Sequence, residues 1–99
     1  MMKEEPKKYY TYLMRCADGT YYCGYTDDIE KRAAAHNSGR GAKYTRTRLP
    51  VTPVYAEAFD TKKEAMSREW HIKRFSRRQK EELIASEQNL IQVGALLSP

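Results

Sequence analysis

The sequence predicts an α/β protein of the α+β type, in which one small sheet packs with three helices. Two tyrosine-rich segments lie on either side of a tight turn at Asp18-Gly19, which is the pattern of an antiparallel hairpin. A third run of strand-forming residues follows later, and helix start signals precede three other segments. The predicted strands are residues 9–16, 20–25 and 52–59, and the predicted helices are residues 29–37, 62–75 and 77–87.

Length and composition indicate one soluble domain. The chain has 99 residues, of which 40% are apolar and 31% are charged. No apolar run reaches the length of a membrane span, and the charged N-terminus lacks the apolar core of a signal peptide, so we expect a cytoplasmic protein. We expect a flexible N-terminus (1–7), one domain (8–87), and a C-terminal tail (88–99) whose structure the pattern does not predict.

Basic residues are concentrated in two segments. The chain has 18 Lys and Arg against 13 Asp and Glu, which gives a net charge of +5. Residues 40–48 include four basic side chains and residues 73–80 include five, and neither segment contains an acid. Such segments favour a polyanion, with nucleic acid as the first candidate, although a net charge of this size also serves solubility.

The two cysteines argue against a structural zinc site. Cys16 and Cys23 lack the C-x-x-C spacing of a zinc or redox pair, and the chain has two histidines to complete such a site. In a reducing compartment we expect both to be free thiols in the hairpin.

The turn of the hairpin leaves two registers open. Tyr12 and Tyr22 lie in the two predicted strands. A two-residue loop, Asp18-Gly19, would place these tyrosines on opposite faces of the sheet. A three-residue loop that begins at Ala17, with Gly19 in the left-handed conformation, would place them on the same face. The sequence alone permits either.

The first predicted helix carries two polar residues at its inward stripe. Asp28 is a suitable N-cap, and Ser38-Gly39 ends the segment. On a wheel of roughly 100° per residue, His36 falls on the inward stripe and Arg32 lies beside it.

Glycine and proline mark interruptions of regular structure. Gly24 lies within a predicted strand, where glycine often marks the close approach of another group. Residues 38–50 show no apolar periodicity, so we expect a basic loop with Tyr44 in its middle. Pro50 and Pro53 indicate that the third strand does not start at a central paired position.

Glu69 falls within the apolar arc of the helix that a Thr61–Glu64 capping box opens. Carboxylates are seldom placed there without a partner. An ion pair with Lys73 or an arginine is one explanation. A divalent-metal ligand is the other, because a hard cation can be held by one carboxylate together with waters and phosphate. The arc consists of Ala65, Met66, Trp70, Ile72 and Phe75.

Four further side chains could form a site with Glu69. Eight tyrosines against two phenylalanines are more hydroxyls than a packed core requires. Taken singly, Tyr12, Tyr22, Arg32 and His36 each have an explanation in packing or in a solvated surface. Together they could supply a group that activates a nucleophile, a phosphate clamp and a proton shuttle.

These residues also carry a resemblance to a known family. The motifs follow one another in the order Tyr10-Thr11-Tyr12, Tyr22-Cys23-Gly24, the segment 28–37 with Arg32 and His36, and a helical Glu69. This ordered set resembles the GIY-YIG endonuclease superfamily over about residues 8–85. The stretch Gly-Ala-Lys-Tyr-Thr-Arg at 41–46 resembles its small stand-alone bacterial members, which are largely uncharacterised.

The resemblance implies a GIY-YIG-like fold, a three-stranded antiparallel sheet flanked by three helices. It implies that Tyr12 and Tyr22 are the motif tyrosines and point into one site, which favours the three-residue loop. It further implies that Arg32 is the catalytic arginine, His36 the second polar residue of its helix, and Glu69 the metal ligand. The sequence departs from the family pattern at Tyr10, where glycine is usual, and at Tyr25, where repair-type members have lysine.

The functional hypothesis is a Mg²⁺- or Mn²⁺-dependent endonuclease that hydrolyses DNA phosphodiester bonds, with catalytic residues Tyr12, Tyr22, Arg32, His36 and Glu69. Tyrosine and histidine would assist the attacking water, and Glu69 would hold a single metal ion. We expect DNA backbone contacts with low base specificity. The residues expected to make them are Arg40, Lys43, Tyr44, Arg46, Arg48, Lys73, Arg74 and Arg77.

Two alternatives remain open at this stage. The chain could be a nucleic-acid-binding module with weak or no nuclease activity, which Tyr25 favours. It could also be a small interaction domain whose tyrosines are packing groups.

Overall fold

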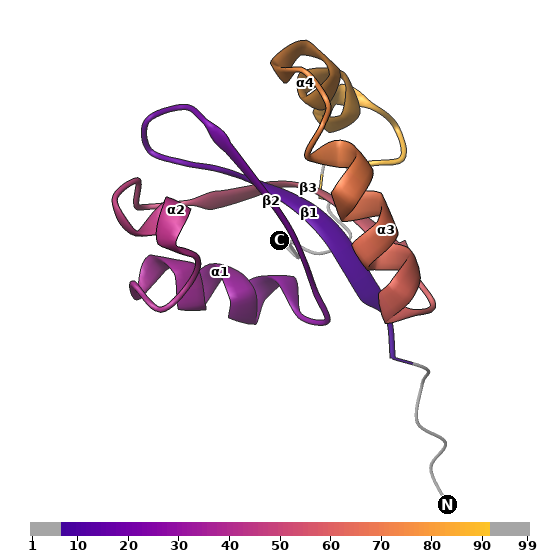
Figure 1. Cartoon of the computed structure of the whole chain (residues 1–99), viewed down its shortest axis with the longest axis horizontal. Helices are drawn as coiled ribbons and strands as arrows, with labels where there is room; N and C mark the ends of the chain where they lie inside the picture. Colours follow the sequence, from indigo (N-terminus) through magenta and orange to yellow (C-terminus); the bar gives the residue numbers. More distant parts are fainter. Residues whose placement is uncertain (1–6, 92–99) are drawn as a thin grey trace, which may run out of the picture.

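The computed structural model describes residues 7–91. The predictions for residues 1–6 and for 92–99 therefore lie outside the described residues. Figure 1 shows how the elements are arranged. In chain order they are β1 (Tyr9–Arg15), β2 (Tyr21–Thr26), α1 (Ile29–Asn37), α2 (Lys43–Arg46), β3 (Thr52–Phe59), α3 (Lys62–Ile72) and α4 (Arg77–Ala85).

The sheet has three antiparallel strands, as predicted, and the structure places them in the order β2-β1-β3. Tyr12 pairs with Gly24, which is the register of the three-residue loop. The Cys16 amide donates to the Thr20 carbonyl at 2.8 Å, and Gly19 has a φ of 86°, a conformation that glycine adopts without strain. Strand β3 lies at the edge of the sheet, which agrees with its prolines.

The two faces of the sheet are covered by different helices. Because side chains alternate along a strand, Tyr12 faces one side of β1 and Leu13 the other. Tyr12 packs in a core cluster with Ile29 of α1, and Leu13 in a second cluster with Ile72 of α3. Figure 1 shows α1 below the sheet and α3 to its right. Any site that joins α1 to α3 must therefore form at an edge of the sheet.

Side-chain caps set the starts of the three longer helices where the sequence predicts them. Asp28 accepts a hydrogen bond from the Lys31 amide at 3.0 Å. Capping boxes open α3 at Thr61 and α4 at Ser76. The ends differ from the prediction, because α3 ends at Ile72 and α4 at Ala85 rather than near residues 75 and 87.

The predicted loop at 38–50 contains a fourth helix, α2, within the described residues. It spans four residues, too few for an apolar repeat to show in the sequence. Thr45 is fully buried in it, and its hydroxyl donates to the Ala42 carbonyl at 2.9 Å. Packing and this hydrogen bond therefore hold Thr45, the buried residue of α2, in place.

The apolar arc predicted for α3 is wrong at two positions. Ala65 and Ile72 are fully buried, whereas Met66 is 44% and Trp70 is 53% exposed. The buried stripe is narrower than the wheel predicted, and Glu69 lies at its border with a side chain 18% exposed.

No helix among residues 7–91 is long and apolar enough to cross a membrane.

Residues 88–91, which the sequence left without a prediction, lie against β3. Asn89 is fully buried and its Nδ2 donates to the carbonyls of Val54 and Ile84, both at 2.8 Å. Its Oδ1 accepts from the Ala56 amide at 3.2 Å. This side chain joins β3 to the end of α4.

Candidate active site

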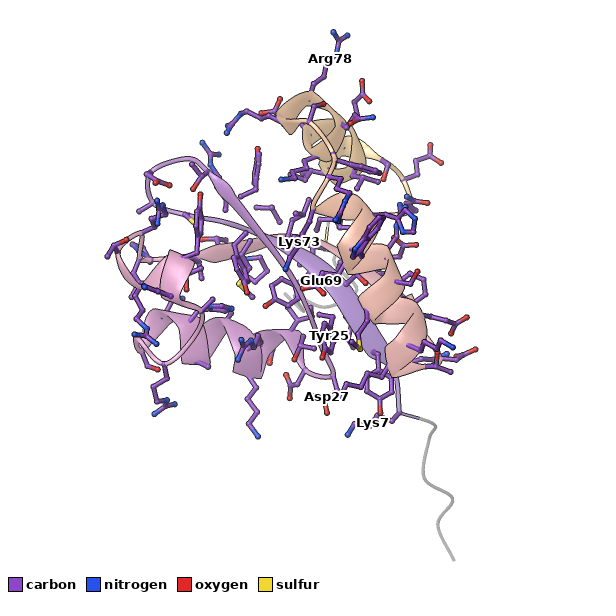
Figure 2. The ribbon with its side chains drawn as sticks, viewed as in Figure 1. Lys7, Tyr25, Asp27, Glu69, Lys73 and Arg78 are labelled. Carbon is purple, nitrogen blue, oxygen red and sulfur yellow. The ribbon has the colours of Figure 1, made fainter. Side chains whose placement is uncertain are left out.

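Four of the five predicted catalytic residues surround one hollow of about 310 Å³. Tyr12, Tyr22, Arg32 and Glu69 line it, so β1, β2, α1 and α3 each contribute one of them. The other lining residues are Gly24, Tyr25 and Thr26 of β2, which is an edge strand. Figure 2 shows Glu69 with Tyr25 on one side and Lys73 on the other.

Gly24 makes room for the phenol of Tyr12. A Cβ atom at Gly24 would lie 2.5 Å from Tyr12 Oη and 2.7 Å from Tyr12 Cζ, which is too close for a real contact. The ring of Tyr12 therefore lies directly over the glycine, and the close approach that the sequence suggested is the approach of a motif tyrosine.

His36 is buried behind Tyr12 rather than at the rim. Its Nε2 is 3.2 Å from Tyr12 Oη, and its Nδ1 is 2.8 Å from Thr45 Oγ1. Because the single hydroxyl hydrogen of Thr45 goes to the Ala42 carbonyl, Oγ1 is free to accept from Nδ1–H. The Ala42 amide also points at Nδ1, but at 3.4 Å, so we assign the tautomer from the shorter contact with Thr45, which leaves the lone pair on Nε2 to accept from the Tyr12 hydroxyl.

Burial, and secondarily the nearby Arg32 guanidinium, lower the pKa of His36 below its ordinary 6.5. Burial also raises the pKa of Tyr12 to about 12, although its interaction with Arg32 opposes the rise. Near neutral pH, Tyr12 is consequently a phenol and His36 a neutral imidazole. The phenol can pass its proton to the imidazole while its oxygen takes a proton from a third group, so that no free phenolate has to form.

The side chain of Arg32 extends from α1 to the hollow that the two phenols also line. Its contact with the Tyr12 hydroxyl is the largest effect that raises the pKa of its guanidinium, and the Tyr22 phenol adds to it. The guanidinium is thus held at the hollow in its charged form, the form that binds a phosphate oxygen.

Glu69 faces the same hollow and forms an ion pair with Lys73, whose Nζ is 3.3 Å from Oε2. Of the two explanations that the sequence left open, the ion pair with Lys73 is present, and the metal-ligand role stays a prediction. Among residues 7–91, no three histidine, cysteine, aspartate or glutamate side chains are grouped to share a metal ion. A single carboxylate beside an arginine suits a hard divalent cation that takes its other ligands from water and phosphate.

Comparison with known proteins decides the family. Residues 8–82 match the GIY-YIG catalytic domain. The chain belongs to the GIY-YIG family. A UPF0213 protein of Streptococcus pneumoniae is 55% identical over 82 residues, which cover 83% of each chain. A UPF0213 protein of Halobacterium salinarum is 57% identical over 75 residues, which are 76% of this chain and 97% of the relative.

Solved structures agree with the fold. The solution NMR structure of a UPF0213 protein from Bacillus halodurans is 43% identical, with a TM-score of 0.54, over 92% of this chain and 97% of the other. An E. faecalis protein solved by the same method is 44% identical, also with a TM-score of 0.54, over 81% and 85% of the two chains. The GIY-YIG domain indicates a nuclease-type function and a nucleic acid partner.

The hollow of this GIY-YIG domain continues into two others along β2. Thr26 and Arg32 are shared with a hollow that Asp27, Asp28 and Lys31 also line. On the other side, Tyr22 is shared with a hollow toward α4. That hollow is lined by Tyr21, Tyr22, Cys23, Tyr44, Lys73 and Lys80. We call the three together the β2 groove.

The predicted DNA-contacting residues fall into three groups. Lys73 and Tyr44 line the β2 groove. Arg40, Lys43 and Arg46 are exposed around α2.

The other three arginines already have protein partners. Arg48 pairs with Asp18 at 3.0 Å and lies 3.9 Å from the Tyr44 ring centre. Arg77 pairs with Glu81 at 3.0 Å. Arg74 lies on Trp70, on the outer face of α3.

Three residues that hold or extend the site were not predicted individually from the sequence. Thr45 contacts His36, and a Cβ atom at Gly41 would lie 2.1 Å from His36 Nδ1. Both lie in the 41–46 stretch that carried part of the resemblance, which was the available signal. Lys80 lines the β2 groove and was visible in the sequence only as part of a basic segment.

Proposed function

We propose that this GIY-YIG protein is a divalent-metal-dependent endonuclease that hydrolyses DNA phosphodiester bonds. The observation that supports this most is the convergence of Tyr12, Tyr22, Arg32 and Glu69 on one hollow, although they are spread over four elements. A phosphodiester in that hollow would meet a guanidinium, a carboxylate and two phenols. These groups are suited to stabilise charge on phosphate and to handle the proton of an attacking water.

Proton transfer would run through Tyr12 and His36. Water gives its proton to Tyr12 Oη while the Tyr12 proton moves to His36 Nε2, 3.2 Å away. This concerted route is consistent with a Tyr12 pKa of about 12, because no phenolate accumulates. Tyr22, which is more accessible than Tyr12, would help Arg32 to orient the phosphate.

Glu69 would hold one Mg²⁺ or Mn²⁺ ion. When bound, such an ion supplies Lewis-acid stabilisation of the phosphate and of the leaving oxygen. Lys73 pairs with Oε2, so the ion would bind at Oε1 or displace the ammonium, which would then be free for a DNA phosphate.

The proposal is tested by incubating the purified protein with branched, nicked and linear DNA, with and without Mn²⁺. We expect cleavage by the native chain to need Mn²⁺ and to fall by roughly 10²- to 10³-fold or more in Glu69→Ala and Arg32→Ala. Matched controls are Glu82→Ala and Arg78→Ala on α4, whose exposed side chains lie outside the β2 groove and which should keep most of the activity. Cleavage that survives both site variants would overturn the proposal.

The same assay separates the second candidate, a nucleic-acid-binding module with weak or no nuclease activity. Tyr25 favours it, because it lines the hollow at a position where a lysine would add a cation. Salt-sensitive binding by a native chain that does not cut any of these DNA structures would support the module.

A further inference from the structure

The outer face of α3 is an exposed apolar surface framed by cations. Met66 is 44% and Trp70 is 53% exposed. They line a shallow hollow of about 640 Å³, which is larger than the 310 Å³ of the candidate active site. Its remaining lining residues are Lys62, Lys63, Ser67 and His71, and none of the six is a carboxylate. We call this surface the α3 outer face.

The indole of Trp70 is held in place although it is exposed. The Arg74 guanidinium carbon lies 3.4 Å from the ring centre, and Arg74 Nη1 donates to the Trp70 carbonyl at 2.9 Å. The His71 ring meets the indole edge-on, with centroids 5.1 Å apart. A large aromatic surface fixed in this way loses little conformational freedom when a flat ligand stacks on it.

The α3 outer face begins at the rim of the candidate active site. Glu69 and Trp70 are consecutive in α3 and so point about 100° apart around the helix. Lys62, which lines the outer face, has its Nζ 6.0 Å from the Tyr25 ring centre. Tyr25 lines the active-site hollow. A polymer bound in the hollow can therefore continue over Lys62 toward Trp70.

We propose that the α3 outer face binds a single-stranded segment of the DNA substrate, with a base stacked on Trp70 and phosphates at Lys62 and Lys63. The nature of the partner rests on the proposed function. An indole with cations beside it and no acid in its lining fits a chain that alternates flat rings with negative charge. Duplex DNA hides its base faces, which favours a single strand.

A second copy of the chain fits this face less well. In a two-fold contact the same patch meets itself, so lysines would face lysines across the interface. That arrangement is unfavourable unless acids are interspersed, and none lines the patch.

Trp70 is the single tryptophan of the chain, so its fluorescence reports on this surface directly. The test uses the full-length Glu69→Gln variant in EDTA, so that turnover plays no part. Three probes are titrated: an oligothymidine strand, a strand of equal length with abasic linkers, and a duplex. We expect strong quenching by oligothymidine and little by the other two. Binding of oligothymidine without quenching, or equal quenching by the abasic strand, would overturn the inference.

Variants give a second readout, the anisotropy of a labelled oligothymidine strand. Trp70→Ala should weaken binding by roughly tenfold, and Trp70→Phe should recover part of the loss, because stacking on an aromatic ring contributes about 1–3 kcal/mol per base. Arg78→Ala on α4 is the control, since that side chain is 89% exposed and points away from α3 in Figure 2. Equal affinity of Trp70→Ala and the native chain would contradict the proposal.

The two proposals fail in distinguishable ways. Quenching without cleavage of any DNA would reject the nuclease and keep the strand-binding surface. Cleavage without quenching would reject the strand-binding surface and keep the nuclease. A tryptophan emission shift that depends on protein concentration and occurs without DNA would assign the surface to a second copy.

Discussion

At the scale of single residues, the site depends on a buried chain of hydrogen bonds from Tyr12 through His36 to Thr45 and Ala42. Thr45 does not reach the hollow, but its hydroxyl decides which nitrogen of His36 carries the proton. Without it, the Nε2–H tautomer becomes accessible, since the Ala42 amide already lies 3.4 Å from Nδ1. We therefore regard Thr45 as a positioning residue.

Replacing Thr45 separates this role from simple packing. Thr45→Val keeps the shape but removes the acceptor, so we expect roughly 10- to 100-fold slower cleavage, because His36 Nε2 no longer accepts the Tyr12 proton. Thr45→Ser should restore most of the rate. Ring ¹⁵N chemical shifts of His36 should show the tautomer change without any turnover. An unchanged tautomer in Thr45→Val would contradict the assignment.

The pH dependence of the rate gives a second check on the same residues. The active form has neutral His36, whose pKa is lowered from 6.5, so activity should be lost only as pH falls below 6.5. Thr45→Val should move this acid limb to still lower pH, because the imidazolium loses an acceptor for Nδ1–H. A purely structural role would leave the midpoint where it is.

Residue patterns predicted which side chains would lie close together but not how deeply each would be buried. Glu69 stood out because a carboxylate within an apolar arc is unusual. His36 was placed only at the stripe, since a wheel gives direction and not burial. Trp70 was assigned to the core because the wheel treats all apolar residues alike, whereas the stripe of α3 that packs on the sheet is too narrow to include it.

At the scale of elements, side-chain caps made the helix starts predictable. The side chains of Asp28 and of the two capping boxes bond to backbone amides only a few residues away, so the sequence alone shows these caps. The hairpin register was not predictable from its residues alone, because two- and three-residue loops are both compatible with Asp18-Gly19. The family resemblance resolved it correctly. Helix α2 and the docking of Asn89 were not predicted, because neither produces a periodic pattern of apolar residues in the sequence.

The docking of residues 88–91 on β3 leads to a stability prediction. Asn89→Ala leaves the Ala56 amide and the carbonyls of Val54 and Ile84 without this partner in the interior. We expect a loss of about 2–3 kcal/mol in the free energy of unfolding, measured by urea denaturation. The exposed neighbour Glu87→Ala should change it by less than about 0.5 kcal/mol. Equal effects of the two changes would show that this side chain does not anchor the segment.

At the scale of the whole molecule, the sheet edge at β2 brings α1 and α3 to one groove although they cover opposite faces. The net charge of +5 is consistent with a polyanion partner, but only part of the basic residues face the groove. Composition indicated a polyanion as the class of partner. It could not indicate which basic side chains form ion pairs within the protein, as Arg48 and Arg77 do.

The salt dependence of DNA binding tests which cations contact the backbone. Each phosphate contact contributes about 0.9 to the slope of log affinity against log salt for duplex DNA. Lys80→Gln in the β2 groove should lower that slope by about this amount. Arg78→Gln, two residues away on the same helix and pointing outward, should leave it unchanged. Equal slopes for the two variants would place the DNA elsewhere.

We propose that Glu69 would hold a metal ion in the hollow where Arg32 and the two tyrosines would meet the phosphate. It is tested most directly by the broadening of side-chain NMR signals by Mn²⁺ in the presence of DNA with an uncleavable backbone. We expect broadening of the Tyr12, Tyr22 and Arg32 signals in the native chain and its loss in Glu69→Gln. Broadening that persists in Glu69→Gln, or that centres on Asp27, would contradict it.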